Sequence, residues 1–350
     1  MFCIFKTKNI KFFPKVFLEI IDTKQIIMKY LLFACFSVFI LHGASAQDAR
    51  LTQFESAPLL LSPANTGNFK GDFRATSTLS KVSNDTLHNN FSNIGFDYKF
   101  GKKKANAFGF SYSHSGANGF AMSGDYYGVS GSHLLSLDSN KVHALRFGFQ
   151  ASYMVGKYDL SKPGFTPLLD PKSFYYYNPK AVGDLDFFSN KYMNFALGID
   201  YSLTKNNFKF ETSIGAYNIS NPKYSIIKMK PLEKRVRLAV SNSFSYKVDN
   251  LNTLKISQFT WQEGLYLRKS NNNKSDSLNL SETTYGMEWT RGAKLPYSIG
   301  LYSRSLKTAS VMVGTNIFKG FFAKMSYEFP LYKSYYSIRQ FGLSLVYIKD

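Results

Sequence analysis

Alternation of large apolar residues with small or polar ones is the feature that most constrains how this chain folds. Between Tyr192 and Leu203, one set of alternate positions carries Met193, Phe195, Leu197, Ile199, Tyr201 and Leu203, and the other carries Asn194, Ala196, Gly198, Asp200 and Ser202. Successive side chains of a β-strand point to opposite faces, so this period indicates a strand whose two faces differ in chemistry. The pattern recurs from about residue 70 onward, and no helical period of comparable length appears.

The alternating segments predict about fourteen strands, at approximately 70–82, 91–101, 105–116, 120–137, 142–157, 191–205, 207–219, 234–249, 252–269, 279–291, 295–305, 308–318, 320–329 and 337–348. A strand that crosses a bilayer at a tilt needs about 9 to 11 residues, whereas strands of globular proteins average about 5 or 6. Most of the segments reach the longer range, which favours strands that cross a membrane.

The connections between these segments alternate in length. Those after the even-numbered strands are short, and several after odd-numbered strands are long: 83–90, 158–190, 220–233, 270–278 and 330–336. Outer-membrane barrels have short periplasmic turns and longer external loops. The predicted fold is therefore all-β, a transmembrane antiparallel up-and-down β-barrel of about 14 strands. We expect loop 158–190, which is rich in proline and aromatic residues, to form a packed lid or docking surface.

A soluble β-sandwich is the alternative fold, because periodicity alone does not tell which face of a strand meets water. In hydrocarbon every backbone N–H and C=O must be paired within the protein, which only helices and closed barrels achieve. Aromatic residues make up 17% of the chain, and they lie mostly on one face of the strands, while the other face is small and polar. The second face suits a polar lumen, and we therefore prefer the membrane barrel.

The first 46 residues are predicted to be a signal peptide. Met28-Lys29-Tyr30 and the apolar run 31–41 precede Ala44-Ser45-Ala46, an A-x-A site with cleavage between Ala46 and Gln47. Met28 is the expected true start. Both cysteines, Cys3 and Cys35, lie in this segment, so we expect the exported chain to have neither disulfides nor thiol chemistry. A lipoprotein cleavage site at Cys35 is the alternative, but a chain that starts at Met28 has only seven residues ahead of this cysteine, too few for a signal.

Positive charge dominates the composition. The formal net charge is +20, and removing the six Lys and two acidic residues of 1–46 leaves 37 basic and 21 acidic residues, about +16. Attraction to nucleic acid or to lipid phosphates is one interpretation. Solvated turns and a polar barrel interior are the other, which we prefer because the lysines are scattered along the sequence. No nucleic-acid partner is expected.

Residues 47–69 are predicted to form an ordered lead-in that is not a strand. Pro58 and Pro63 remove backbone donors and exclude a central strand, yet Phe54 and the Leu59-Leu60-Leu61 run make a free tail improbable. We expect this segment to pack against the end of the barrel, facing the periplasm or plugging the lumen, and to lead into the first strand at about Lys70.

The lead-in also resembles the amino-terminal signature of the PorP/SprF family, outer-membrane proteins of the type IX secretion and gliding machinery of Bacteroidetes. The resemblance rests on Gln53, Phe54, Pro58, Leu59, Leu60, Leu61, Pro63, Ala64 and Gly67, with Ser62 where the family usually has Asn. Weaker similarity covers 183–222, 325–329 and 343–347. The resemblance implies an outer-membrane barrel with no catalytic role, which works with a periplasmic ring lipoprotein or with a large secreted surface adhesin used in gliding.

A search for reactive groups finds no strong motif. The sequence has no HExxH and no carboxylate cluster with the spacing of a cation site, so no metal or cofactor is expected. Asp85 near His88 and Ser113 near His114 are the candidate pairs for a barrel hydrolase. Ser and Asn are so frequent that we attribute both pairs to chance.

The leading hypothesis is a non-enzymatic outer-membrane barrel that docks ring proteins or assists export and anchoring of an adhesin, with lipid or lipopolysaccharide around it. The alternative is a general diffusion porin. The partner-docking candidates are Gln53, Phe54, Pro58, Leu60, Pro63, Ala64 and Gly67. Asp85-Thr86-Leu87 and Asp276-Ser277-Leu278 are candidate O-glycosylation sites.

Overall fold

The structure is a computed structural model that describes residues 53–83, 88–118, 122–140, 142–159, 187–220, 222–224, 232–233, 236–263, 280–292, 296–332 and 339–349. The expectations for the signal peptide, for the central part of loop 158–190 and for both glycosylation motifs concern residues outside these ranges.

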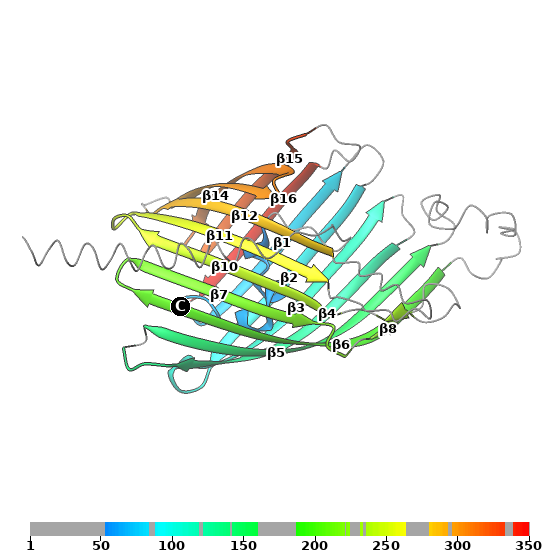
Figure 1. The fold of residues 1–350 in the computed structure, drawn as a ribbon, viewed down its shortest axis with the longest axis horizontal. Coiled ribbons are helices and arrows are strands. Elements are labelled where there is room, and N and C mark those ends of the chain that lie inside the picture. Colours follow the sequence, from blue (N-terminus) through cyan, green and yellow to red (C-terminus); the bar gives the residue numbers. More distant parts are fainter. Residues whose placement is uncertain are drawn as a thin grey trace, which may run out of the picture. The chain divides into compact units, whose positions relative to one another are not determined.

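Fourteen antiparallel strands close into a barrel (Figure 1). They are β1 (Phe73–Ser83), β2 (His88–Phe100), β3 (Asn106–Asn118), β4 (Met122–Ser136), β5 (His143–Asp159), β6 (Phe187–Lys205), β7 (Phe208–Tyr217), β10 (Arg237–Lys247), β11 (Asn252–Glu263), β12 (Leu280–Arg291), β13 (Tyr297–Arg304), β14 (Thr308–Phe318), β15 (Phe321–Pro330) and β16 (Arg339–Lys349). Each strand pairs with its neighbours in the chain, and β1 pairs with β16 to close the ring. The predicted up-and-down barrel of about 14 strands is confirmed.

Short elements complete the described chain. The lead-in contains η1 (Phe54–Ser56), α2 (Pro58–Leu61) and η2 (Pro63–Asn65), and η3 (Lys102–Lys104) forms the turn between β2 and β3. A two-stranded sheet of β8 (Lys223–Tyr224) and β9 (Leu232–Glu233) is not hydrogen-bonded into the barrel sheet. The sequence predicted a plain loop there, because strands of two residues leave no periodic pattern.

The first strand begins at Phe73 rather than at Lys70. Gly71 has φ 114°, a conformation that side-chain-bearing residues rarely adopt and that a regular strand does not contain. The chain therefore turns at Gly71 before it enters the barrel wall. The short turns do follow β2, β4, β6, β10, β12 and β14, so all of them lie at one end of the barrel. We call this end the short-turn rim; bacterial barrels place such turns in the periplasm.

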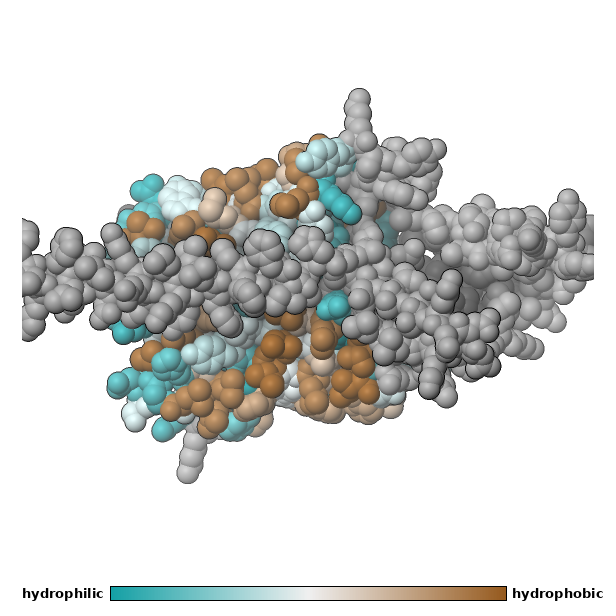
Figure 2. Space-filling view, viewed as in Figure 1, coloured by the Kyte–Doolittle hydropathy of each residue, from teal (hydrophilic) through white to brown (hydrophobic). Residues whose placement is uncertain are grey.

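The two faces of each strand divide as a membrane barrel requires. Along β6, Met193, Leu197 and Ile199 are 58%, 52% and 48% exposed, whereas Asn194 and Asp200 are 2% and 3% exposed. The apolar face thus points outward and the small polar face points into the lumen. Hydrophobic residues lie on the outer wall, and hydrophilic ones gather at the short-turn end on the left (Figure 2). A soluble sandwich would bury the opposite face, and that alternative is wrong.

Among the described residues no helix has the length and apolar character needed to cross a membrane.

Candidate functional site

The lead-in occupies the lumen of the barrel. Its three helical turns are drawn in blue between the front and back walls (Figure 1). Phe54, Ser62 and Ala64 are 2%, 0% and 0% exposed. Of the seven docking candidates, Leu60 is half-buried and the other six are buried. The expected packing against the barrel end needs correction, because the contacts lie inside, at mid-strand positions of the wall. Of the two placements that the sequence left open, facing the periplasm or plugging the lumen, these contacts match the second.

Three glycines make room for the centre of the lead-in. Gly148, Gly198 and Gly215 stand opposite one another on β5, β6 and β7. A Cβ on Gly198 would lie 2.7 Å from the Ala64 nitrogen, and one on Gly215 would lie 2.8 Å from the Leu61 carbonyl oxygen. Real Cβ atoms do not approach so closely, so only glycine fits at these positions. We call this row the glycine slot.

Hydrogen bonds fix the segment that sits in the glycine slot. The Ser62 hydroxyl donates to the Ile214 carbonyl on β7 at 3.2 Å, and its oxygen accepts from the Ala64 N–H at 3.3 Å. Ser62 therefore both caps η2 and attaches it to the wall. The Asn65 amide donates to the Pro58 carbonyl at 3.2 Å, which closes α2 and η2 into one compact unit.

A buried ion pair clamps the end of the lead-in. Arg74 on β1 donates to both carboxylate oxygens of Asp97 on β2, at 2.9 and 2.6 Å. The same carboxylate accepts the Gly67 N–H at 2.7 Å, and Arg74 also donates to the Asn65 carbonyl at 2.9 Å. The two side chains are 8% and 1% exposed, so their charges are compensated almost wholly by each other and by the lead-in backbone.

Thr66 joins the clamp to β4 and β5, which follow β3 around the wall. Its hydroxyl lies 2.7 Å from the Ser130 hydroxyl on β4. Its carbonyl accepts from Ser132 at 2.6 Å and from Arg146 of β5 at 3.4 Å. The residues after Pro63 are therefore held by β1, β2, β4 and β5 together.

The first turn of the lead-in spans the strand pair that closes the barrel. Thr78 of β1 and Ser344 of β16 are direct partners across this seam. The Thr78 hydroxyl donates to the Ser56 carbonyl at 3.4 Å, and the Ser344 hydroxyl donates to the Ser56 hydroxyl at 2.9 Å. One residue before η1, the Gln53 amide donates to the Gly342 carbonyl of β16 at 3.3 Å.

Apolar and charged contacts attach the same turn to the far wall. The Phe54 ring stacks on Phe259 with centroids 5.2 Å apart and meets the Tyr302 ring edge-on at 6.2 Å. Glu55 accepts from Lys255 of β11 at 2.7 Å. The lead-in is thus bound on both sides of the lumen, by aromatic packing and by an ion pair.

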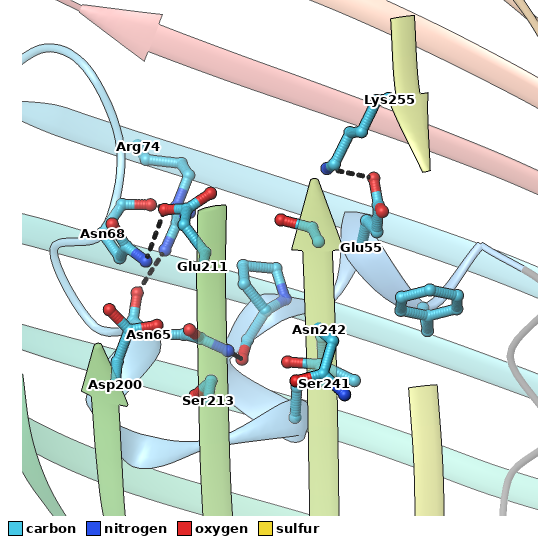
Figure 3. Close-up of a pocket in the computed structure, with 14 residues that line it drawn as sticks. Glu55, Asn65, Asn68, Arg74, Asp200, Glu211, Ser213, Ser241, Asn242 and Lys255 are labelled. Carbon is cyan, nitrogen blue, oxygen red and sulfur yellow. Dashed lines mark hydrogen bonds and ion pairs between the residues drawn. The ribbon is translucent and has the colours of Figure 1, made fainter. Parts of the chain in front are cut away.

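A cavity of about 140 Å³ remains between the lead-in and the wall. Figure 3 shows that polar side chains of β6, β7, β10 and β11 point into it from the wall, among them Asp200, Glu211 and Asn242. The Asn68 amide donates to Glu211 at 3.4 Å across the cavity. Its polar lining and its size suit several water molecules.

A second polar network lines the lumen beyond η1. Arg304 of β13 donates to Glu328 of β15 at 2.8 Å and to Gln340 of β16 at 3.0 Å. Lys324 lies 2.9 Å from both carboxylate oxygens of Glu288. Sequence reasoning missed these partners, because they come from different strands and only the strand order and register of the sheet bring their side chains together.

Of the two candidate hydrolase pairs, Ser113 and His114 do not come together in the structure. His114 Nδ1 lies 2.8 Å from an Asp125 oxygen, but Tyr112 and Lys157 also bind this carboxylate. Ser113 is on the opposite, lumenal face and contacts Asn93 at 3.0 Å. Neighbouring residues of a strand cannot meet, which separates Ser113 from His114. Asp85 lies outside the described residues. The described part of the chain holds no group of three potential metal ligands.

Comparisons with solved structures find barrels of low similarity. The toluene transporter TbuX of Ralstonia pickettii aligns with a TM-score of 0.49 and 10% identity, over 87% of this chain and 95% of that one. The toluene transporter TodX of Pseudomonas putida gives 0.47 and 10%, over 87% and 98%. The translocator domain of the autotransporter NalP from Neisseria meningitidis gives 0.40 and 8%, over 84% and 94%. Similarity at this level carries no argument about function.

The sequence comparisons are more specific. A search of curated proteins finds no match. The family model described as type IX secretion system membrane protein PorP/SprF matches residues 43–347, which include the lead-in and nearly all of the barrel. Together with the closed barrel and its outward apolar face, this match places the protein in the outer membrane, and the chain belongs to the PorP/SprF family of type IX secretion membrane proteins.

Proposed function

We propose that the protein is a non-enzymatic scaffold of the type IX apparatus, a filled barrel that docks a periplasmic ring protein or helps to export and anchor a secreted surface adhesin. The observation that carries this proposal is the lead-in inside the lumen. It is held by the glycine slot, by the Arg74–Asp97 clamp and by Phe54 packing. A barrel whose interior is occupied by its own chain is better suited to hold partners than to pass solutes.

The partner-docking candidates of the lead-in have an indirect role in this proposal, because they do not contact a partner themselves. Because Gln53, Phe54 and Ala64 are at most 5% exposed, they do not present a surface to a partner. We propose instead that the filled lumen keeps the wall and its turns in one fixed arrangement, which partners then bind. Packed interiors transmit such constraints because they are close to incompressible.

A pull-down from detergent-solubilised outer membranes tests the proposal. The wild-type chain is compared with a variant that carries Phe54→Ala and Leu60→Ala. We expect a ring lipoprotein or a large adhesin to co-purify with the wild type and to be reduced with the variant. A wild-type protein that always purifies alone would count against the scaffold.

The diffusion porin is the alternative, and planar bilayers separate it from the scaffold. We expect the wild type to conduct weakly, and a chain without residues 47–66 to conduct more. Equal, large conductance of both chains would favour the porin. Replacing His114 by Ala tests the hydrolase class in the same preparations, since any hydrolytic activity that this change abolished would contradict a purely structural role.

A further inference from the structure

Lysines that are scattered in the sequence converge on the short-turn rim in the structure. Within the described residues, this rim carries nine basic residues in its turns or at the strand ends beside them: Lys70, Lys102, Lys103, Lys104, Lys205, Lys247, Arg291, Lys319 and Lys349. We call this set the basic rim. Every one of its members whose side chain is described is exposed. The sequence analysis assigned these lysines to solvated turns, because their common position depends on the barrel topology.

Acidic residues of the same rim do not balance this charge. Among the residues that the structure describes they are Asp72, Asp138 and Asp249, and Asp72 is paired with Lys104. Asp138 accepts the backbone N–H groups of Val142 and His143 at 3.0 and 2.8 Å. These bonds direct the Asp138 carboxylate to the backbone of its own turn. The rim therefore keeps a large excess of exposed positive charge.

Asp249 is used in the same way. It accepts the N–H groups of Leu251 and Asn252, each at 2.7 Å, and also the Asn252 amide. This carboxylate directs its hydrogen bonds to its own turn, although it also attracts Arg291 electrostatically. Positive charge at the rim is thus available to another molecule.

The positive charge continues inside the mouth of the barrel. Lys99 of β2 faces the lumen, lies 4.6 Å from the centre of the Phe69 ring and donates to the Phe69 carbonyl. Lys209 of β7 also faces inward, but Glu211 balances its charge, so Lys99 carries this extension of the rim. Lipid headgroups surround the outer wall and do not reach this mouth. A partner that covers both the rim and the mouth is a protein rather than a lipid.

We propose that the basic rim is the docking surface for an acidic face of a periplasmic protein partner. This inference rests on the proposed scaffold function and names the surface and the chemistry of its partner. Opposite charge across an interface accelerates encounter and suppresses wrong partners. Because screening acts over about 8 Å at physiological ionic strength, the association depends on salt.

Site-directed cross-linking in the cells that produce the protein tests this inference. Photoreactive side chains are placed at Ser139 and Asn250, in turns of the short-turn rim, and at Leu306 in the turn at the opposite end. The rim variant carries Lys103→Glu, Lys205→Glu and Lys319→Glu. A matched control makes the same charge change away from the rim, with Lys81→Glu, Lys191→Glu and Lys307→Glu. Heat-modifiable migration on gels verifies that both variants fold.

We expect a protein product from Ser139 and Asn250, cross-linked through a peptide rich in Asp and Glu. The rim variant loses this product, and the control keeps it. We also expect the rim variant in nanodiscs to bind the purified soluble domain of the identified partner at low salt. Its association rate should be lower than that of the wild type by about tenfold or more.

Three results would overturn the inference. The first is a product that survives charge reversal, the second is a product formed only from Leu306, and the third is phospholipid as the only product at the rim. Each would contradict docking at the basic rim and would leave the scaffold function standing. If neither end of the wild-type barrel forms a protein product and nothing co-purifies, the scaffold function itself fails.

Discussion

Gly148 and Gly198 face each other across β5 and β6, and the space left by their missing side chains is filled by Pro63 and Ala64 of the lead-in. The position of the lead-in is therefore determined by residues of the wall as well as by the lead-in itself. This complementarity makes the occupied lumen testable through single residues of the wall.

Replacing Gly198 by Leu is expected to displace the lead-in while the barrel persists. The new side chain would overlap Ser62, the Ala64 nitrogen and Pro63, and a wall strand cannot retreat from them without breaking its ladder. Limited proteolysis should then cut the lead-in, and conductance in planar bilayers should rise. Gly124→Ala is the matched control, since a Cβ there meets nothing within 4 Å. An uncut lead-in in the Leu variant would contradict this account.

Breaking the Arg74–Asp97 clamp is expected to destabilise the folded protein. In Asp97→Asn, the buried Arg74 guanidinium loses its countercharge, which typically costs about 3 to 5 kcal/mol. The unfolding midpoint in urea, measured in lipid vesicles, should fall accordingly. Adding Arg74→Gln to Asp97→Asn removes the unpaired charge and should recover part of the loss. If the double variant is less stable than Asp97→Asn alone, the unpaired charge of Arg74 is not the main cause of the lost stability.

Phe54→Ala is expected to loosen the first turn of the lead-in. This side chain is 2% exposed and stacks on Phe259, and truncation of a buried Phe typically costs about 3 to 5 kcal/mol. Hydrogen exchange should accelerate at residues 54–61 but not in β3 or β4. Phe54→Leu, which keeps most of the volume, should have a smaller effect. Uniform exchange over the whole barrel in both variants would show that the turn is not a separate unit.

Acid is expected to weaken the turn between β10 and β11. The Asn252 side chain, with the backbone N–H groups of Leu251 and Asn252, lowers the pKa of Asp249. A lowered folded-state pKa means that the ionised carboxylate stabilises the turn above the unfolded-state pKa, and that this contribution disappears as pH falls through the folded-state pKa. Exchange of the Leu251 amide should accelerate in that window. In Asp249→Asn the exchange rate of the Leu251 amide should no longer respond to the titration of a carboxylate. A response that persists in this variant would show that another group is responsible.

Much of the fold could be predicted because each strand carries its own signal. The range 308–318 agrees with β14 at both ends, and 252–269 agrees with β11 at its start. Alternation of apolar and polar residues predicts a strand because successive side chains of a strand point to opposite faces. This signal needs no information from any other part of the chain. The predicted strand 252–269 extends past Glu263, where β11 ends, and residues 264–269 lie outside the described ranges.

The candidate site was less predictable, for a reason that the lead-in illustrates. Its prolines and leucines predicted an ordered segment that is not a strand, and the helical turns η1, α2 and η2 agree with that. Its position inside the lumen depends on Gly148, Gly198 and Gly215, which are unremarkable in sequence and become one slot only through strand register. The basic rim was hidden in the same way, because distance along the chain conceals closeness in space.

The position of Ser56 on the Thr78–Ser344 pair bears on how the protein is assembled. The lead-in is synthesised before β1, whereas β16 is the last strand to arrive. Closure of the ring is therefore the step at which the two ends of the barrel sequence first meet, and Ser56 touches both of them there. A chain that closes without its lead-in inside would lack these bonds at its newest junction, so the hydrogen bonds of Ser56 favour closure of the ring around the lead-in.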